Sequence, residues 1–183
     1  MRDGKMRQDG KMPQTGKTRH AEVETVLGNL TLIADGDALT AVYFPGHWTL
    51  PQRESFGERV DGDALLEDAA RQLREYLAGE RRTFELTTAP RGNAFQLAVW
   101  RLLKEIPYGA TTTYGALAER LGGRGLAQTV GQAVGHNLLS IIVPCHRVIG
   151  SDGSLTGYGG GLERKRFLLE LEEPAEAKAA RLF

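Results

Sequence analysis

Alternating apolar and polar residues dominate the segment 22–44. The alternation covers 23–27, and two further apolar runs cover 30–34 and 39–44. A period of two is typical of strands with one buried face, and the Asp-Gly-Asp sequence at 35–37 indicates a hairpin. The pattern therefore predicts three antiparallel strands in succession.

From residue 63 the apolar spacing lengthens to that of helices. In 63–78, apolar residues recur three or four positions apart, which predicts an amphipathic helix. The same spacing over 95–106 predicts a second helix whose apolar stripe contains Trp100. Between them, 83–86 is expected to form another strand, and 87–93, which contains a proline and a glycine, is expected to be a linker.

Shorter helices are expected next. The segment 112–120 begins with threonines suited to cap a helix, and the glycine-rich turn 122–125 separates it from a helix over 126–134. Helix, tight turn and helix form the outline of a helix-turn-helix, which many helical pairs share. A final helix is expected over 162–172, before Pro174.

These elements together predict an α+β fold in two lobes. An N-terminal lobe, 21–88, combines the antiparallel three-stranded sheet with a helix, and a mostly helical C-terminal lobe, 93–174, carries the helix-turn-helix. Residues 1–20 are rich in glycine, lysine and arginine and almost free of large aliphatic side chains, so they are expected to be a disordered basic tail. Residues 175–183 are expected to be a C-terminal tail.

The charge balance and the cysteine count narrow the classes of function. The 183 residues include 23 basic and 23 acidic side chains, so any nucleic-acid surface must be a local basic patch. A single cysteine excludes an internal disulfide framework and fits a reducing compartment. No apolar run is long enough to span a membrane, and the N-terminus lacks the apolar segment of a secretory signal. A cytoplasmic location is therefore expected.

The single cysteine, Cys145, lies in the run Ile-Ile-Val-Pro-Cys-His-Arg-Val-Ile-Gly at 141–150. The β-branched lead-in predicts a short buried strand that stops at Pro144, which has no N–H for the ladder. A thiol needs a base to become a thiolate, and His146 is the neighbouring candidate. Adjacent residues of an extended chain point to opposite faces, so His146 reaches the thiol only if the chain kinks or through one water molecule. For such a pair taken alone, a buried inert thiol is the simpler alternative.

Further motifs accompany this run in a fixed order. They are Phe95-Gln96, Trp100, Ile106-Pro107-Tyr108-Gly109, Thr113-Tyr114-Gly115, Ala127, Val130-Gly131, Gly135, Asn137, Pro144 to Gly150, Gly157 to Gly161 and Lys165 to Glu172. In order and spacing the chain resembles the O6-alkylguanine-DNA alkyltransferase family over most of its length. The resemblance implies a ribonuclease-H-like N-terminal lobe, a winged-helix-like C-terminal lobe and DNA repair by direct reversal.

The resemblance also implies a reaction. One methyl or alkyl group would move irreversibly from guanine O6 in duplex DNA, with thymine O4 as a further candidate, to Cys145 after the nucleotide flips out of the helix. His146 would take the thiol proton through water, and Glu172 would orient His146. Asn137 would bridge the helix-turn-helix to the active-site loop, and Tyr114 would promote nucleotide rotation and donate a proton to the leaving base. Each chain would act once, as a suicide methyltransferase.

The partner implied by the resemblance is double-stranded DNA that contains O6-alkylguanine. No cofactor is implied, because the substrate carries the group that moves. No membrane contact and no obligate protein partner are implied, so a monomer is expected. The histidines at 20, 47, 136 and 146 and the one cysteine show no zinc-ligand spacing, so no metal site is predicted.

Two sets of contacts follow from the resemblance. Contacts to DNA are expected from Tyr114, Gly115, Ala127, Gln128, Gly131, Arg147 and Ser151. The base pocket is expected to be lined by Pro144, Val148, Leu155, Gly157, Tyr158, Gly159 and Gly160. Gln128 stands where the family has an arginine, and because glutamine carries no charge, weaker or more salt-sensitive DNA binding is expected.

Three other functions fit parts of the pattern. A non-catalytic DNA-binding module that senses alkylated bases would use the helix-turn-helix, but related proteins of that kind replace the cysteine that is present here. A thiol hydrolase would need turnover and an oxyanion hole, and it leaves the helix-turn-helix unexplained. A redox-sensing thiol would need a second cysteine to resolve it, and the chain has one.

Overall fold

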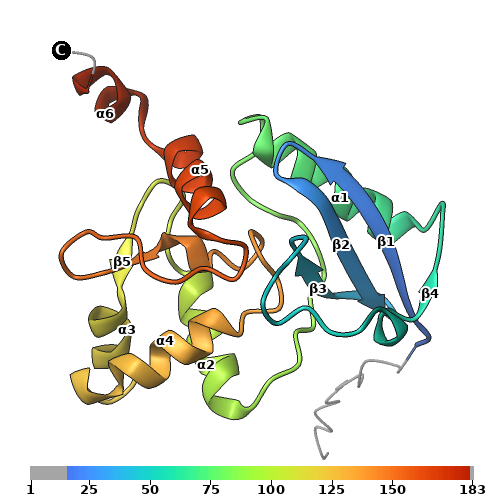
Figure 1. The fold of residues 1–183 in the computed structure, drawn as a ribbon, viewed down its shortest axis with the longest axis horizontal. Coiled ribbons are helices and arrows are strands. Elements are labelled where there is room, and N and C mark those ends of the chain that lie inside the picture. Colours follow the sequence, from blue (N-terminus) through green and yellow to red (C-terminus); the bar gives the residue numbers. More distant parts are fainter. Residues whose placement is uncertain (1–15, 182–183) are drawn as a thin grey trace, which may run out of the picture.

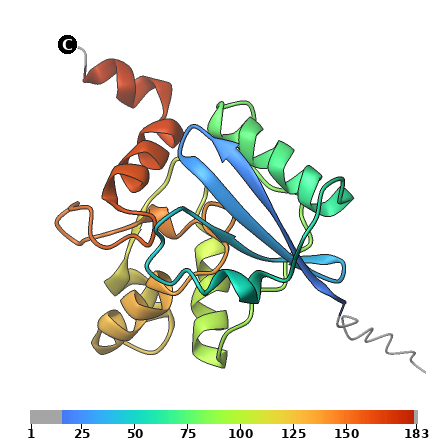
Figure 2. The same ribbon diagram turned by 45° about the vertical axis from the view of Figure 1, so that its right-hand side comes forward.

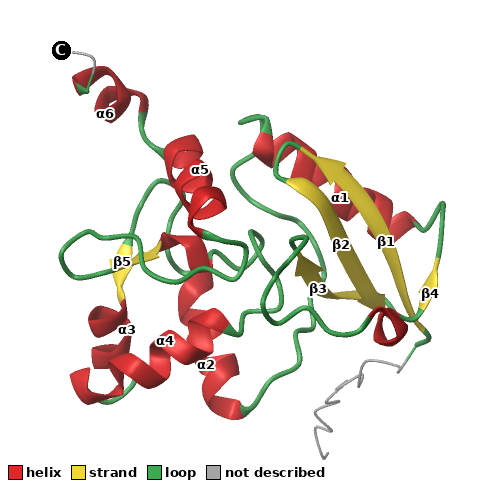
Figure 3. Ribbon diagram, viewed as in Figure 1, coloured by secondary structure: helices red, strands yellow, loops and turns green. Residues whose placement is uncertain are grey.

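The computed structural model describes residues 16–181, which form two lobes in contact with each other (Figure 1). One lobe is a sheet with a helix and the other is mostly helical, as the colours of Figure 3 show. A continuous hydrophobic core includes Leu32 of the first lobe and Trp100 and Leu168 of the second. The predicted α+β class is confirmed. The basic tail predicted for 1–20 lies, up to residue 15, outside the described residues.

The three predicted antiparallel strands are present, and a fourth strand extends them. The strands β1 (Thr18–Thr25), β2 (Gly28–Asp35) and β3 (Ala38–Tyr43) pair antiparallel in succession. The short β4 (Glu58–Arg59) pairs parallel to β1, so the sheet is mixed and has the order β3-β2-β1-β4. The tight turn before β2 ends at Gly28, whose φ of 106° is open to glycine without a steric cost.

The predicted limit of the basic tail at residue 20 is wrong. Strand β1 already begins at Thr18, and the side chain of His20 is buried. The ring of His20 meets the ring of Phe56 edge-on, with 5.5 Å between the centroids. A contact between residues so distant along the chain leaves no mark in the local composition, so the composition alone placed the boundary too late.

The helix predicted over 63–78 is α1 (Ala64–Leu77), and it packs along the sheet (Figure 2). The Asp63 carboxylate caps it by accepting from the N–H of Leu66 at 3.0 Å. The strand predicted over 83–86 is absent. There the side chain of Gln72 accepts from the N–H of Glu85 at 2.8 Å and donates to its carbonyl at 3.1 Å, so a side chain replaces the strand partner.

The linker predicted over 87–93 begins along the edge of β3. The N–H of Leu39 donates to the Thr87 carbonyl and the N–H of Ala89 donates to the Leu39 carbonyl, each at 2.9 Å. The start of the linker is therefore hydrogen-bonded to the sheet of the first lobe, and its end leads directly into the second lobe.

The C-terminal lobe contains the predicted helix pair. Helix α2 (Ala94–Lys104) begins with a capping box formed by Asn93 and Gln96. Helix α3 (Tyr114–Arg120) and helix α4 (Ala127–Gly135) pack against each other, and α4 also packs on α2. The helix-turn-helix outline predicted from the sequence is therefore present in the structure.

Two further helices close the chain. Helix α5 (Leu162–Glu172) matches the predicted 162–172, and α6 (Ala175–Ala180) replaces part of the predicted C-terminal tail, which corrects that prediction. A small parallel pair, β5 (Thr112–Thr113) with β6 (Val148–Ile149), ties the start of the helix pair to the segment after Cys145. Among residues 16–181, no helix is long and apolar enough to cross a membrane.

Candidate active site

Cys145 begins one turn of 3-10 helix, Cys145–Arg147. The residues 141–143 before it form a turn and not a strand, so the predicted strand is wrong. Ile141 and Val143 are buried as expected and Ile142 is half-buried, but the lead-in turns, and Ile141 has a φ of 71°. A positive φ is uncommon for a β-branched residue, so contacts elsewhere must hold it. The chain therefore does kink beside Pro144, which places Cys145 on a tightly shaped loop.

Asn137, which follows α4, holds this loop from inside. Its buried Nδ2 donates to the Val143 carbonyl at 2.9 Å and lies 3.2 Å from Cys145 Sγ. Its Oδ1 accepts from the N–H of Leu139 at 3.1 Å. One amide therefore fixes the loop and places a donor beside the thiol.

His146 and Glu172 meet in the core beneath this loop. His146 Nε2 lies 2.8 Å from Glu172 Oε1, and both side chains are almost fully buried. Glu172 is the last residue of α5, and the preceding turn of that helix places Leu168 in the core. The sequence-predicted pair is thus brought together across 26 positions of the chain.

Two more side chains complete the surroundings of Glu172. Arg147 donates from Nε to Oε2 and from Nη2 to Oε1, each at 2.8 Å, and from Nη1 to the Ile106 carbonyl at 2.6 Å. The Tyr76 hydroxyl, from α1 of the N-terminal lobe, also donates to Glu172 Oε1 and lies 3.5 Å from His146 Nε2. The carboxyl is therefore a junction between the two lobes.

The protonation of Glu172 follows from two opposing effects. Burial raises the pKa of its carboxyl to about 8. The Arg147 guanidinium acts in the opposite direction, because a bidentate cation stabilises the carboxylate. Burial lowers the pKa of Arg147 only to about 10, so the guanidinium is charged at neutral pH. Because two N–H groups of the charged Arg147 guanidinium donate to the Glu172 oxygens at 2.8 Å, we assign Glu172 as ionised.

His146 is neutral in this network. Burial and the positive charges of Arg147 and Lys165 lower the pKa of His146 well below its usual value. Since the Glu172 carboxylate can only accept, the ring proton is assigned to Nε2. The lone pair then lies on Nδ1, which is buried and bonds to no described protein group. His146 therefore has the tautomer of a general base.

The thiol itself is protonated at neutral pH. Burial raises the pKa of Cys145, while the Asn137 amide and the charge of Lys165 oppose that rise. Lys165 is buried on α5, and its Nζ donates to the Val148 carbonyl at 2.6 Å and to the Thr156 carbonyl at 2.9 Å. Burial lowers the pKa of Lys165 to about 8. The site thus holds a thiol that becomes reactive only when a base removes its proton.

A cavity of about 250 Å³ opens onto Cys145. It is bounded by residues of α3 and α4, by the glycine-rich loop after β6, and by the loop after β3 of the N-terminal lobe. Its lining is His47, Trp48, Tyr114, Gly131, Val134, Gly135, Asn137, Cys145, Gly157, Tyr158 and Gly159. A planar group of the size of one nucleobase is the kind of ligand that such a small cavity with glycine walls admits.

The cavity at Cys145 contains part of the expected base pocket. Gly157, Tyr158 and Gly159 line the cavity at Cys145, and four other expected residues do not. Pro144 lines a hollow beside Arg82 and Lys104, Val148 is fully buried, Leu155 lines a hollow behind Glu172, and Gly160 packs against the Phe44 ring. Val148 and Gly160 therefore pack against the interior beside the cavity, and Pro144 and Leu155 face other hollows.

The expected DNA contacts fall into two groups. Six of the seven residues are at least partly exposed: Tyr114, Gly115, Ala127, Gln128, Gly131 and Ser151. Arg147 differs, since it is only 7% exposed and its guanidinium is occupied by Glu172 and Ile106. The expectation that Arg147 contacts DNA is therefore wrong, because an adjacent buried carboxylate draws the side chain inward.

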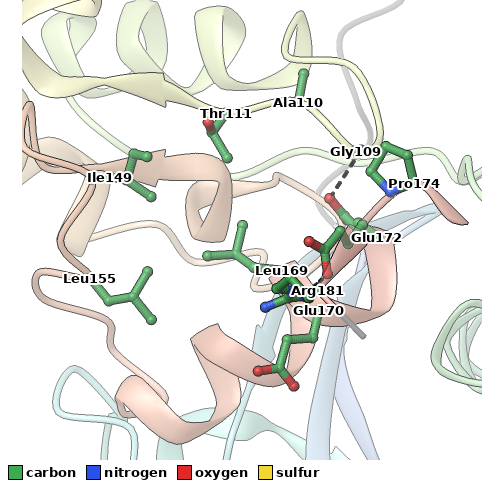
Figure 4. Close-up of a pocket in the computed structure, with 12 residues that line it drawn as sticks. Gly109, Ala110, Thr111, Ile149, Leu155, Leu169, Glu170, Glu172, Pro174 and Arg181 are labelled. Atoms are coloured by element: carbon green, nitrogen blue, oxygen red, sulfur yellow. Dashed lines mark hydrogen bonds and ion pairs between the residues drawn. The ribbon is translucent and has the colours of Figure 1, made fainter. Parts of the chain in front are cut away.

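A second hollow lies behind the catalytic network (Figure 4). Figure 4 shows Leu155 and Ile149 on one side and Glu172 and Arg181 on the other. The N–H of Gly109 lies 3.5 Å from Glu172 Oε2 at its edge. Cys145 does not line this hollow, so we assign the reactive cavity to the other side of the network.

His47 gives a prediction for stability in acid. Burial lowers the pKa of folded His47 to about 4, whereas an unfolded histidine titrates near 6.5. As the pH falls, the unfolded chain binds the proton before the folded protein does. The stability that neutral His47 contributes to the folded protein is therefore complete above about pH 6.5 and is lost as the pH falls through 4. The loss amounts to about 3 kcal/mol. Urea unfolding at a series of pH values should give a smaller acid-dependent loss for His47→Gln than for the wild type; equal losses would contradict the assignment.

Several residues of this site were missed by sequence reasoning. Tyr76 lies in the apolar stripe of α1 and gives no sign of a polar role. Lys165 could have been found, because it precedes Leu168 by three positions and Glu172 by seven and so shares their face of α5. His47 and Trp48 lie in a loop of the N-terminal lobe, where no periodic pattern indicates a role in the site. Within residues 16–181, no group of three or more His, Cys, Asp or Glu side chains is arranged to hold a metal ion.

Two family models match the chain. The 6-O-methylguanine DNA methyltransferase ribonuclease-like domain matches residues 19–90, and the DNA binding domain of the same description matches 94–174. A methylated-DNA–protein-cysteine methyltransferase of Mycobacterium tuberculosis is 46% identical over 159 residues, which cover 82% of this chain and 90% of the relative. The protein of that name from Methanosarcina acetivorans is 44% identical over 154 residues, which cover 84% and 97%.

Solved structures of proteins with related names are also similar to this chain. A crystal structure of the Mycobacterium tuberculosis O6-methylguanine methyltransferase has 41% sequence identity and a TM-score of 0.77, and the match covers 88% of this chain and 98% of that one. A crystal structure of Mycobacterium tuberculosis OGT in complex with DNA has 44% identity and the same TM-score of 0.77, with 84% and 92% covered.

Proposed function

The chain belongs to the 6-O-methylguanine DNA methyltransferase family, and on that premise we propose that it repairs DNA by moving an alkyl group from guanine O6 to Cys145. The observation that carries the proposal is the position of Cys145. The only cysteine lies at a cavity bounded by the helix pair and the glycine-rich loop, above a buried His146–Glu172 pair. The reaction is a direct reversal of damage and occurs once per chain.

The chemistry follows from the protonation states of the site. The thiol proton passes through a water molecule to His146 Nδ1, and the charge that results on the ring is stabilised by the Glu172 carboxylate. The thiolate attacks the alkyl carbon in line with the carbon–O6 bond. A carbon–sulfur bond forms, the carbon–O6 bond breaks, and its electron pair remains on guanine. The products are a thioether on Cys145 and an intact guanine once the base regains a proton.

Tyr114 is placed to supply that proton. Burial raises the pKa of its hydroxyl, so it is protonated and can donate at neutral pH. Its ring lines the cavity beside Gly131, and its hydroxyl donates to the Thr156 carbonyl at 3.1 Å. A flipped nucleotide that displaced this hydrogen bond would receive the donor in its place.

The duplex is proposed to lie along the helix pair. Half-buried Ala127, Gly131 and Gly135 on α4 are small, so this helix can approach a groove closely. Gly131 connects α4 with the cavity. We assign 93–174 to DNA binding and alkyl transfer and 21–88 to support, with an alkyl group on thymine O4 as a second substrate for the same attack. A cytoplasmic monomer is the form that fits one free thiol and a single-use reaction.

Intact mass measurement tests the function. Mixing the protein with a short duplex that holds one O6-methylguanine should add one methylene equivalent to the wild type, saturating at one per chain. Cys145→Ala, which keeps the fold but lacks the nucleophile, should gain nothing. Selective binding of the damaged duplex with no change in mass would replace the proposal with a sensor of alkylated bases.

Gln128 gives a prediction for DNA affinity. Gln128→Arg should tighten binding, because an added cation on exposed α4 neutralises a phosphate and releases a counterion. The slope of log affinity against log salt should become steeper by about 0.9. Fluorescence anisotropy across a salt series measures this. The control is Gln52→Arg, which adds the same charge to an exposed loop of the other lobe; an equal change in both variants would remove Gln128 from the DNA surface.

A further inference from the structure

The N-terminal lobe supplies one wall of the cavity at Cys145. His47 and Trp48, in the loop that follows β3, line the cavity together with residues of α4 and of the glycine-rich loop. The two lobes are also joined behind this wall, where Arg164 of α5 donates to the Leu27 carbonyl at 2.8 Å. The lobe that we described as support therefore reaches the reactive centre.

His47 anchors this wall. Its side chain is buried, its Nδ1 lies 2.9 Å from the Thr49 hydroxyl, and its ring meets Tyr43 edge-on. A Cβ added to Gly159 would lie 2.2 Å from His47 Nε2, so the ring rests directly on the backbone of the glycine-rich loop. The position of the next residue, Trp48, is thereby fixed relative to the cavity.

Trp48 stands at the rim and not in the core. It is 59% exposed, although it is one of the largest apolar side chains of the chain. Its ring meets His136 edge-on at 4.8 Å between centroids, and a Cβ on Gly135 would touch it at 3.5 Å. A tryptophan with most of its surface in solvent contributes little to folding, so its position at the mouth of a reactive cavity points to a role in binding.

The arrangement separates two sides of the cavity. Tyr114 and Gly131 bound the side toward the helix pair, from which the nucleotide enters in the proposed function. Gly135 lies one turn further along α4, and there Trp48 packs against the helix, with His47 next to it in the cavity lining. The reacting carbon must lie next to Cys145 Sγ, and Trp48 lines the same cavity, one turn of α4 beyond the entry side, so it is a wall that atoms beyond that carbon can meet.

We propose that Trp48 determines which alkyl groups the protein accepts, by limiting the size of the substituent on guanine O6. This inference rests on the proposed function. A cavity of about 250 Å³ holds a base and a small substituent but crowds an aromatic one, since pockets for larger ligands start at about 300 Å³. Most other lining residues are glycines or members of the catalytic network, so Trp48 is the wall that a substitution can remove.

Competing substrates test the inference. Wild type, Trp48→Ala and Trp48→Phe are each mixed with duplexes that hold O6-methylguanine or O6-benzylguanine, and intact mass gives the two transfer rates. The ratio of benzyl to methyl transfer should rise about tenfold in Trp48→Ala, the size of selectivity that a change in pocket volume produces, and by less in Trp48→Phe. The ratio is measured within one preparation, so a fraction of inactive protein cancels.

Leu50→Ala is the matched control. Leu50 is an apolar residue of the same loop, 37% exposed, and it does not line the cavity, so its ratio should equal that of the wild type. A ratio in Trp48→Ala that is unchanged or lower overturns the size limit, and a lower ratio would identify Trp48 as a stacking partner of the benzyl ring. A wild type that transfers neither group overturns the proposed function, and the inference with it.

Discussion

Methyl transfer by His146→Gln is expected to be about 10²- to 10⁴-fold slower than by the wild type, the usual contribution of a general base. Glutamine keeps an N–H close to the position of Nε2, so the hydrogen bond to Glu172 can persist, but it has no basic nitrogen. Because burial raises the pKa of Cys145, the thiol does not ionise by itself near pH 7. Single-turnover rates from intact mass, with the methylated duplex in excess, measure the loss.

The dependence of the transfer rate on pH shows whether His146→Gln is slow because it lacks the base or because its fold is damaged. In His146→Gln, hydroxide must supply the thiolate, so the rate should rise about tenfold per pH unit between about pH 7 and 9, whereas the wild type should rise less steeply. The control is His20→Gln, which removes a histidine from the sheet of the N-terminal lobe and should react like the wild type. A variant with a normal rate and a normal profile would exclude His146 as the base.

The periodic elements were predictable from the sequence because their signals are local. Alternation over 22–44 and the three-to-four spacing over 63–78, 95–106 and 162–172 reflect one buried face each, and the structure has a strand or helix in each place. The predicted strand 83–86 failed for a non-local reason, since the side chain of Gln72 satisfies that backbone. A residue buried in the middle of a helix can bond to a distant segment without altering the apolar pattern.

The candidate site was predictable only through its motifs. The resemblance brought together Cys145, His146 and Glu172, which no periodicity links. It did not identify Tyr76, because tyrosine in an apolar stripe is typical of a core residue, and only the fold brings its hydroxyl to the carboxyl of another lobe. It misassigned Arg147, because an arginine near a DNA-binding motif is ordinarily a phosphate ligand, and the neighbouring buried carboxylate is visible only in three dimensions.

Arg147 yields the largest predicted effect on stability. Arg147→Met is expected to lower the free energy of unfolding by about 3–5 kcal/mol, because it leaves the buried Glu172 carboxylate without its cation. The control is Arg120→Met, whose ion pair with Glu105 is more than half exposed, so its loss should cost at most about 1 kcal/mol. Urea unfolding followed by circular dichroism gives both values.

A double variant distinguishes a lost ion pair from lost packing. Since Arg147→Met harms the protein mainly through the unpaired carboxylate, the addition of Glu172→Gln should restore part of the stability instead of lowering it further. If the two losses simply add, the guanidinium acts through packing alone. If Arg147→Met instead keeps normal stability while its salt dependence on undamaged duplex weakens, the side chain belongs to the DNA surface after all. The buried geometry, with three guanidinium donors used inside the protein, predicts the first of these results.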